Sequence, residues 1–294
     1  MKHIHTENTQ QMVVACIDGA MLTDAVCDYA AWISKRVDAP LKLLHTIDHH
    51  HETAVTADLS GNIGLGSQED LLEEISGLEQ QQSKLKLQKG KLLLQAAKDH
   101  VIAAGIPEPI CSKRHGGLIE SLIELEENIR VLVLGVRGQV HDEQNNTIGA
   151  KLEAVIRSLH RPILIVNEEF TTPQTIMLAY DGSEAAEKAV AMVASSPLYK
   201  GLTCHLVCVN KNAANVASLL QQAQAKLKKA TDLTLITASL SGKAEQELCA
   251  YQQEHHVDLT IMGAFSHTRL REMLLGSFTV KMLVHTKKPL LLLR

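Results

Sequence analysis

Aromatic residues are scarce in this chain of 294 residues, where they account for 3% of the positions and include one tryptophan. Stacking platforms for nucleobases and aromatic cages for cations are therefore not expected. The 29 lysines and arginines are outnumbered by 33 aspartates and glutamates, and the net charge of −4 disfavours nucleic acid or an anionic membrane as the main partner. No secretory signal and no apolar run of about 18 residues is present, so we expect a globular protein of the cytoplasm.

Cysteine pairs and catalytic motifs are also lacking. The six cysteines are scattered without a C-x-x-C pair, which argues against a disulfide framework or a zinc ribbon. Cys204 and Cys208 lie on one face of the apolar run CHLVCV and are interpreted as core thiols. The histidines at 49–51 have no second ligand set at a defined spacing, so we expect a solvated loop and no metal site. No P-loop, G-x-S-x-G or H-E-x-x-H motif occurs; we therefore expect no enzyme and nominate no catalytic residue.

What the chain does contain is an internal repeat. Two copies of one domain account for nearly the whole sequence, and we place them at residues 1–168 and 174–294, with a polar seam between them. The matched pairs are Asp18-Gly19 with Asp181-Gly182, VLVLG (131–135) with LTIMG (259–263), and RPILIV (161–166) with KPLLLL (288–293).

Within each copy, short apolar runs alternate with amphipathic stretches. Near-continuous apolar strands separated by helices are typical of a parallel sheet that is covered on both faces. The predicted fold class is α/β, with two tandem open five-stranded parallel sheets whose ligands bind beyond the carboxyl ends of the strands. In the second copy we expect strands at 175–180, 202–209, 233–240, 259–263 and 289–293, and helices at 183–195, 215–229, 243–255 and 276–286.

The first copy carries an insertion. Asp18 and Gly135 are 117 positions apart, whereas Asp181 and Gly263 are 82 apart, so the first copy has 35 extra residues. We place them at about 49–98, as a polar loop followed by a Leu-rich helix. That helix is expected to pack mainly on its own domain, although its Gln- and Lys-rich middle leaves an interaction surface open.

The stretch IMGAFSHTRLREMLLGSFT at 261–279 has the features that phosphate binding requires. A strand ends at Gly263, a polar loop follows, and a helix begins near Gly276 and Ser277. Free backbone N–H groups at a helix N-terminus bind phosphate, and the Ser277 hydroxyl can add a donor. Asp181 ends another strand at the same crevice, where its carboxylate can accept hydrogen bonds from a nucleoside.

These residues together make the chain similar to the universal stress protein family in its tandem form. Nucleotide-binding members carry G-x2-G-x9-G-[ST] after the fourth strand; here Gly263, two residues, Ser266, nine residues, Gly276 and Ser277 follow, with serine in place of the second glycine. The resemblance covers both halves and implies a Rossmann-like, adenine nucleotide alpha hydrolase-like fold, with ATP and Mg²⁺ or Mn²⁺ as ligands. The site residues that it implies are Ala179, Tyr180, Asp181, Cys208, Met262, Gly263, Ser266, Gly276, Ser277, Phe278 and Thr279.

The first copy matches the same pattern more loosely. Gly138 keeps the second glycine, but Ala150 follows Gly149 and offers no hydroxyl, and the loop is net negative rather than positive. We therefore expect phosphate to prefer the second copy. In both copies the strand-end aspartate has an alternative role, which is to shape an Asp-Gly turn. The residues of this degenerate site are Asp18, Thr46, Gly135, Gly138 and Gly149.

The resemblance implies an ATP-binding protein that acts as a nucleotide-dependent stress-response or signalling module, with no nucleic acid or membrane as partner. The alternative is a tandem stress protein that binds no nucleotide and works through protein–protein interaction. Slow ATP hydrolysis stays open, although no water-activating residue is evident. Because family members dimerise through their last strands, we expect the two copies to pack as an intramolecular pseudo-dimer, and a homodimer of the whole chain also stays open.

Overall fold

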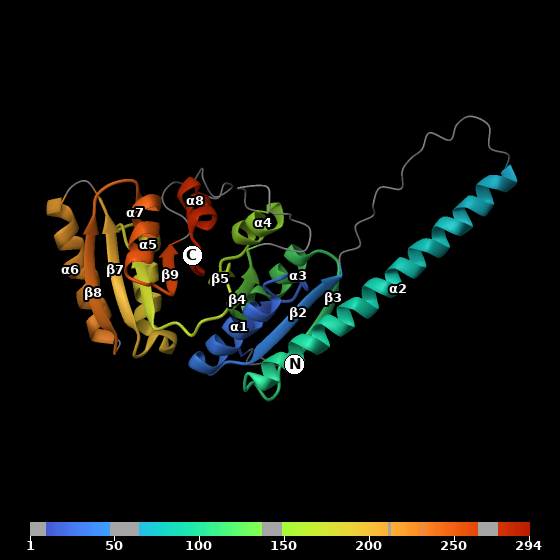
Figure 1. Cartoon of the computed structure of the whole chain (residues 1–294), viewed down its shortest axis with the longest axis horizontal. Helices are drawn as coiled ribbons and strands as arrows, with labels where there is room; N and C mark the ends of the chain where they lie inside the picture. The colour runs from blue at the N-terminus through green and yellow to red at the C-terminus, as the bar shows by residue number, and fades with distance from the viewer. Residues whose placement is uncertain (1–9, 48–64, 137–148, 211–212, 231, 264–275) are drawn as a thin grey trace, which may run out of the picture.

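The described residues of the computed structural model are 10–47, 65–136, 149–210, 213–230, 232–263 and 276–294. They form two successive sets of five strands with helices between them (Figure 1). The N-terminal half contains β1 (Met12–Cys16), α1 (Thr23–Val37), β2 (Leu41–Ile47), α2 (Leu65–Ala103), β3 (Ile110–His115), α3 (Leu118–Leu125), η1 (Glu126–Asn128), β4 (Ile129–Gly135), α4 (Ala150–Ser158) and β5 (Ile163–Val166). The C-terminal half contains β6 (Thr175–Ala179), α5 (Glu184–Ser195), η2 (Pro197–Tyr199), β7 (Thr203–Val209), α6 (Ala213–Ala230), β8 (Thr234–Leu240), α7 (Ala244–Glu254), β9 (Leu259–Gly263), α8 (Ser277–His285) and β10 (Leu290–Leu293).

The strands and helices expected in the C-terminal half are all present, with ends within two residues of their predicted positions. The apolar runs become strands because they are buried on both faces, as Ile176, Met177 and Leu178 of β6 show. Helix α5 begins where Ser183 caps it, since the Ser183 hydroxyl oxygen accepts a hydrogen bond from the Ala186 N–H at 3.2 Å. In this half, the helix-capping residue and the buried apolar runs therefore predict the same helices and strands that the structure shows.

All ten strands belong to one sheet, in the order β3-β2-β1-β4-β5-β10-β9-β6-β7-β8. Pairing within each half is parallel, as expected, and the two halves meet where β5 and β10 pair antiparallel, with Leu164 opposite Leu291. This confirms that the two copies pack through their final strands. The pairing leaves neither of these two strands as an open edge, so each half shields the other.

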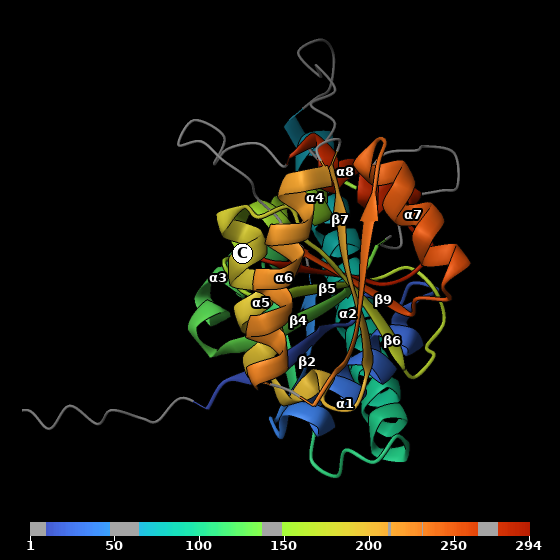
Figure 2. The same ribbon diagram turned by 90° about the vertical axis from the view of Figure 1, so that its left-hand side faces the viewer.

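Helices cover both faces of the sheet and bury a separate core on each. Helices α1, α2, α5 and α6 pack on one face, and α3, α4, α7 and α8 pack on the other. Viewed along the sheet, α5 and α6 lie on one side and α7 lies on the other (Figure 2). Cys204 and Cys208 are fully buried in the first core, which confirms that they are core thiols.

Helix α2 differs from what the sequence led us to expect. It has 39 residues, against 18 for α6 at the corresponding place in the other half. Its C-terminal part packs on the domain, where Leu94, Ala97 and Val101 are buried. Its N-terminal part runs away from the body (Figure 1). The extra residues thus lengthen a helix of the domain itself, and much of that helix has no domain beneath it.

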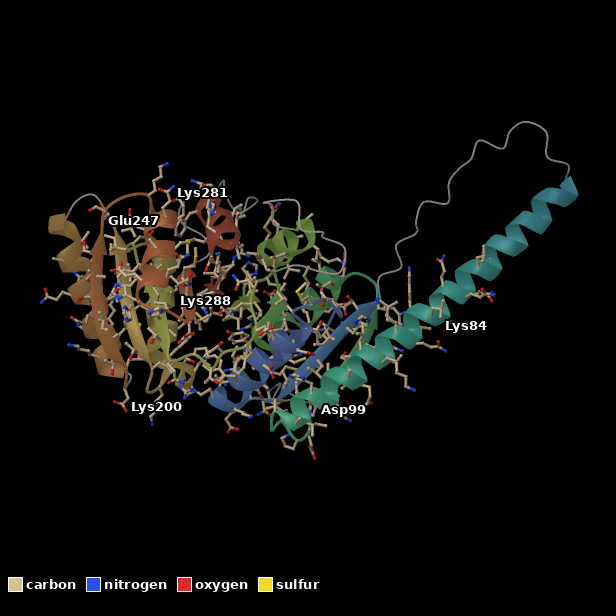
Figure 3. All side chains as sticks on the ribbon, viewed as in Figure 1. Lys84, Asp99, Lys200, Glu247, Lys281 and Lys288 are labelled. Atoms are coloured by element: carbon tan, nitrogen blue, oxygen red, sulfur yellow. The ribbon has the colours of Figure 1, made fainter. Side chains whose placement is uncertain are left out.

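Side chains also tie the two halves together beside the β5–β10 seam. The ring of Phe170, in the segment between the two copies, meets that of Tyr29 edge to face with centroids 4.8 Å apart and so holds this segment against the N-terminal half. Arg36 of α1 donates from Nε to the Leu198 carbonyl oxygen of η2 at 3.0 Å. Lys288 forms a salt bridge with Glu168 at 2.9 Å (Figure 3). The contacts of Arg36 and Lys288, together with the β5–β10 pairing, therefore hold the halves in one arrangement.

Candidate functional site

The same aspartate-glycine turn follows the first strand of each half. The Asp18 carboxylate oxygen Oδ1 accepts from the Ala20 N–H at 2.9 Å, and Asp181 Oδ1 accepts from the Ser183 N–H at 2.9 Å. The glycines between these residues have φ of 73° and 78°, a conformation that glycine adopts without strain. Each aspartate therefore does shape a turn, as the alternative reading expected, and each is exposed at the carboxyl end of its strand.

In the C-terminal half this turn lies at a topological switch point. Strand β6 has β7 on one side and β9 on the other, and the chain reverses its direction across the sheet between them. Open α/β sheets bind ligands at such a point, outside the carboxyl ends of the strands. At Gly263, the last residue of β9, a Cβ atom would lie 2.8 Å from the backbone carbon of Ala185 in α5. Glycine is thus required here because strand and helix approach so closely.

The N-terminus of α8 faces the same edge of the sheet. The crossover from β9 through α8 to the parallel strand β10 brings the start of α8 to the carboxyl side. Gly276 caps the helix without any side-chain hydrogen bond, and Ser277 is exposed. Thr279 is only 2% exposed, so Ser277 is the accessible hydroxyl of the pair. Lys281 donates to Glu245 of α7 at 2.9 Å and fastens α8 in place.

The other predicted site residues that the structure describes differ in their exposure. Tyr180, Cys208 and Met262 are each no more than 2% exposed, whereas Ala179 and Phe278 are partly exposed. Burial, reinforced by the nearby Asp181 carboxylate, raises the pKa of the Cys208 thiol above its usual value. Ser266 lies outside the described residues, as do Gly138 and the histidines at 49–51.

One group beside the turn was not anticipated from the sequence. Glu187 of α5 accepts a hydrogen bond from the Tyr180 hydroxyl at 2.6 Å and another from Lys226 of α6 at 2.6 Å. Both hydrogen bonds lower the pKa of the Glu187 carboxyl, and the bond from Lys226 has the larger effect. Lys226 lies 39 positions after Glu187, and no motif signals such a pair. The bonded side chains join β6, α5 and α6 and steady the turn at Asp181.

The N-terminal half repeats this geometry with fewer polar groups. Gly149 caps α4 with φ −60° and ψ 135°, close to the values of −57° and 138° at Gly276. The next residue is Ala150, which is exposed and has no hydroxyl. Gly135 ends β4, and Thr46 lies near the end of β2. The two helix starts thus share one backbone conformation and differ in the hydroxyl.

Two further findings concern the described residues as a whole. None of their histidine, cysteine, aspartate and glutamate side chains gather in a group of three that could hold a metal ion. Within the same residues, no helix combines the length and the apolar character that crossing a bilayer requires.

Comparison with known proteins matches both halves to one family. The model of the universal stress protein family matches residues 11–167 and again residues 173–294. A universal stress protein of Synechocystis sp. is 34% identical over 285 residues, which are 96% of this chain and 99% of that protein.

Solved structures share the arrangement along nearly the full length. A universal stress protein from Archaeoglobus fulgidus superimposes with a TM-score of 0.69 at 17% identity, over 96% of this chain and 98% of that one. A functionally unknown protein from Pseudomonas aeruginosa gives a TM-score of 0.58 at 13% identity, over 97% of this chain and 92% of that one. At these identities the likeness concerns the fold.

Proposed function

Because the chain belongs to the universal stress protein family, we propose that it is a nucleotide-dependent stress-response or signalling module that binds ATP in its C-terminal half. The domains that we propose are residues 1–168 and 174–294, and the nucleotide belongs to the second. The proposed role is binding, without catalysis.

One observation carries the proposal. An exposed carboxylate, Asp181, and the helix start at Gly276 and Ser277 lie on the carboxyl edge of the sheet, on either side of the switch point between β6 and β9. Gly263 ends β9 between them, and its missing side chain lets strand and helix approach. A carboxylate can accept hydrogen bonds from ribose hydroxyls, and a helix N-terminus whose cap makes no side-chain hydrogen bond can bind phosphate. The edge therefore offers groups for both ends of a nucleotide.

The residues fit ATP in the following roles. Asp181 would accept hydrogen bonds from the nucleoside, while the N–H groups at the start of α8 and the Ser277 hydroxyl would donate to phosphate. ATP would bring Mg²⁺ or Mn²⁺ with it, which neutralises phosphate charge. The buried residues Tyr180, Cys208 and Met262 would meet the ligand through their backbone. In the N-terminal half, Ala150 stands at the position of Ser277 and has no hydroxyl. We therefore propose that the N-terminal half binds nucleotide more weakly.

The test is to denature freshly purified protein and identify any released nucleotide by mass. We expect ATP from the wild type and its loss from Gly276→Val, because a branched side chain at the cap blocks phosphate from the helix N-terminus. Lost charge-assisted hydrogen bonds of about 1.5–3 kcal/mol correspond to binding weakened by roughly 10-fold or more. The variant should fold, since Gly276 has φ −57° and, among the described residues, a Cβ there comes no closer than 3.9 Å to Thr279 Oγ1.

The matching substitution in the other half is Gly149→Val. Nucleotide retained by Gly149→Val and lost from Gly276→Val assigns the binding to the C-terminal half. A wild type that releases no nucleotide and gives no calorimetric response to ATP with Mg²⁺ contradicts the proposal.

A second candidate function is protein–protein interaction without nucleotide. It is favoured by the exposed leucines of α2, three of which are more than half exposed. An empty wild type would leave this candidate, and α2 would be the place to look.

A further inference from the structure

Helix α2 presents a row of leucines to solvent. Leu78, Leu85 and Leu92 are 54%, 64% and 71% exposed, and they recur every seven residues. Leu71 continues the same spacing in the sequence. A heptad repeat of leucine is the pattern by which helices pair in coiled coils. We call Leu78, Leu85 and Leu92 the leucine row.

The leucine row lies on the side of α2 opposite to its own domain. The buried side chains of α2 are Leu94, Ala97 and Val101. Leu94 follows Leu92 by two residues, a rotation of about 200° around a helix of 3.6 residues per turn. The domain therefore cannot cover the leucine row without releasing its own core contacts.

The projecting part of α2 lacks the support that a helix usually requires. Its described side chains at 76–78 and 80–82 are all exposed, and Figure 3 shows Lys84 on this part and Asp99 where the helix lies against the body. Helices in water depend mostly on the packing of an apolar face, and Gly77 weakens this one further. A helix of this length beyond the domain is best explained by a partner along it.

The charges along α2 identify the partner. Residues 69–79 contain five acidic residues and no basic one, whereas residues 84–91 contain four lysines and no acidic one. Two copies side by side in the same direction would place like charges together; in opposite directions, each acidic stretch faces a basic one. We propose that α2 is a dimerisation arm, which pairs antiparallel with α2 of a second copy through the leucine row.

The arrangement is self-complementary about a two-fold axis. The acidic stretch ends at Glu79 and the basic one begins at Lys84, so the axis passes close to Gln81 and Gln82. The strands β5 and β10 are already paired with each other, so the family's usual dimer edge is taken within the chain. A dimer of the whole chain therefore needs another surface, and α2 supplies one.

The proposed contact between the two α2 helices is short and partly polar, and this limits the stability of the dimer. The positions four residues after Leu71, Leu78 and Leu85 are Ile75, Gln82 and Lys89, of which only the first is apolar. Polar residues at such positions fix register and partner number at a cost in stability. We therefore expect a reversible dimer that dissociates on dilution.

The experiment is sedimentation equilibrium of the full chain. The wild type is expected to be a concentration-dependent dimer, and Leu78→Ala/Leu85→Ala to raise the dissociation constant by on the order of 100-fold, since two leucines are lost from each copy. Alanine is the best helix former, so a loss of circular dichroism at 222 nm in this variant would report the lost partner and not a lower helix propensity. The matched control is Ser76→Ala/Gln80→Ala, which changes two exposed positions outside the leucine row and should dimerise like the wild type.

Salt tests the direction of pairing. Raising NaCl from about 50 mM to about 500 mM screens attraction between opposite charges and should weaken the antiparallel dimer several-fold. A dimer that tightens with salt overturns the antiparallel arrangement, because screening strengthens only a pair of like charges. A monomeric wild type at about 100 μM, or a dimer that Leu78→Ala/Leu85→Ala leaves unchanged, overturns the proposal itself.

Discussion

His205 in β7 shows how a single buried side chain makes stability depend on pH. Its side chain is 6% exposed, and its Nδ1 lies 2.8 Å from the Tyr251 hydroxyl of α7. Its ring centroid lies 5.4 Å from that of His255. Burial first, and then the neighbouring His255, lower the pKa of His205. The folded protein therefore resists a proton that the unfolded chain accepts.

This difference in pKa between the folded and the unfolded protein decides how the free energy of unfolding changes with pH. The unfolded histidine takes up a proton near pH 6.5, while the folded one stays neutral at lower pH, so the free energy of unfolding falls as pH drops below about 6.5. We expect the loss from this residue to reach up to about 1 kcal/mol at about pH 5.5.

The measurement is chemical unfolding of the wild type and His205→Gln at about pH 7.5 and pH 5.5. The variant should be less sensitive to acid by up to about 1 kcal/mol, because glutamine does not titrate. The control is Gln221→Ala, an exposed position without a titratable side chain, whose replacement should leave the acid sensitivity as it is. Equal acid sensitivity in His205→Gln and the wild type would contradict the prediction.

At the candidate site, sequence patterns could predict which residues lie at the turn and at the helix start, but not which of their side chains are exposed. The Asp-Gly and Gly-Ser pairs are local chemistry, so the turn at Asp181 and the helix start at Gly276 were predictable. That Thr279 is buried and Tyr180 is bonded to Glu187 depends on how α8 and α5 pack, which no local pattern encodes. Ser266 and Gly138 lie outside the described residues, so their part in a site stays a prediction.

Among the elements, α2 illustrates why helix prediction stops short of packing. Its apolar residues indicate a helix, but leucines occur on more than one side of it, so the sequence alone does not say which side meets the domain. In the structure, the side of α2 that meets the domain contacts α1, β2 and β3. Strands were easier to predict, because burial on both faces makes each of them a continuous apolar run.

Two glycines of α2 should respond oppositely to alanine. At Gly77 a Cβ would meet nothing within 4 Å among the described residues, so Gly77→Ala should add about 1 kcal/mol of helix propensity. At Gly90 a Cβ would lie 2.8 Å from His45 Cδ2, and His45 is itself held by the Ile17 carbonyl oxygen at 2.6 Å. Gly90→Ala should therefore destabilise the fold by about 1–2 kcal/mol.

Circular dichroism and thermal unfolding distinguish the two effects. Gly77→Ala should increase the signal at 222 nm with little change in Tm, since it lies beyond the domain. Gly90→Ala should lower the Tm. If Gly90→Ala proved as harmless as Gly77→Ala, the close approach of α2 to β2 would be in doubt.

On the scale of the whole molecule, the shared sheet should make the two halves unfold together. The β5–β10 pairing, the Lys288–Glu168 salt bridge and the bond from Arg36 to Leu198 cross between them. Trp32 in α1 is the one tryptophan of the chain, so its fluorescence reports on the N-terminal half. We expect the fluorescence transition to coincide with that seen by circular dichroism.

A substitution in the far half tests this coupling. Leu227 of α6 is fully buried, and Leu227→Ala should cost about 2–4 kcal/mol and shift the Trp32 transition by the same amount. The control is Ile236→Ala on β8, where the side chain is 42% exposed and the change should be below about 0.5 kcal/mol. A Trp32 transition that ignores Leu227→Ala would mean that the halves unfold independently.

Joining two copies in one chain has a consequence for assembly, because only one copy has the long helix. Two separate one-domain chains in the same arrangement would each carry an arm like α2, and each pair would bind a further pair at either end. Such an assembly grows without limit. In this chain α2 has 39 residues and its counterpart α6 has 18, so one arm serves the whole molecule and association stops at two copies. Because the two copies are joined in one chain with a single arm, the α2 contact gives a closed dimer and not an open-ended assembly.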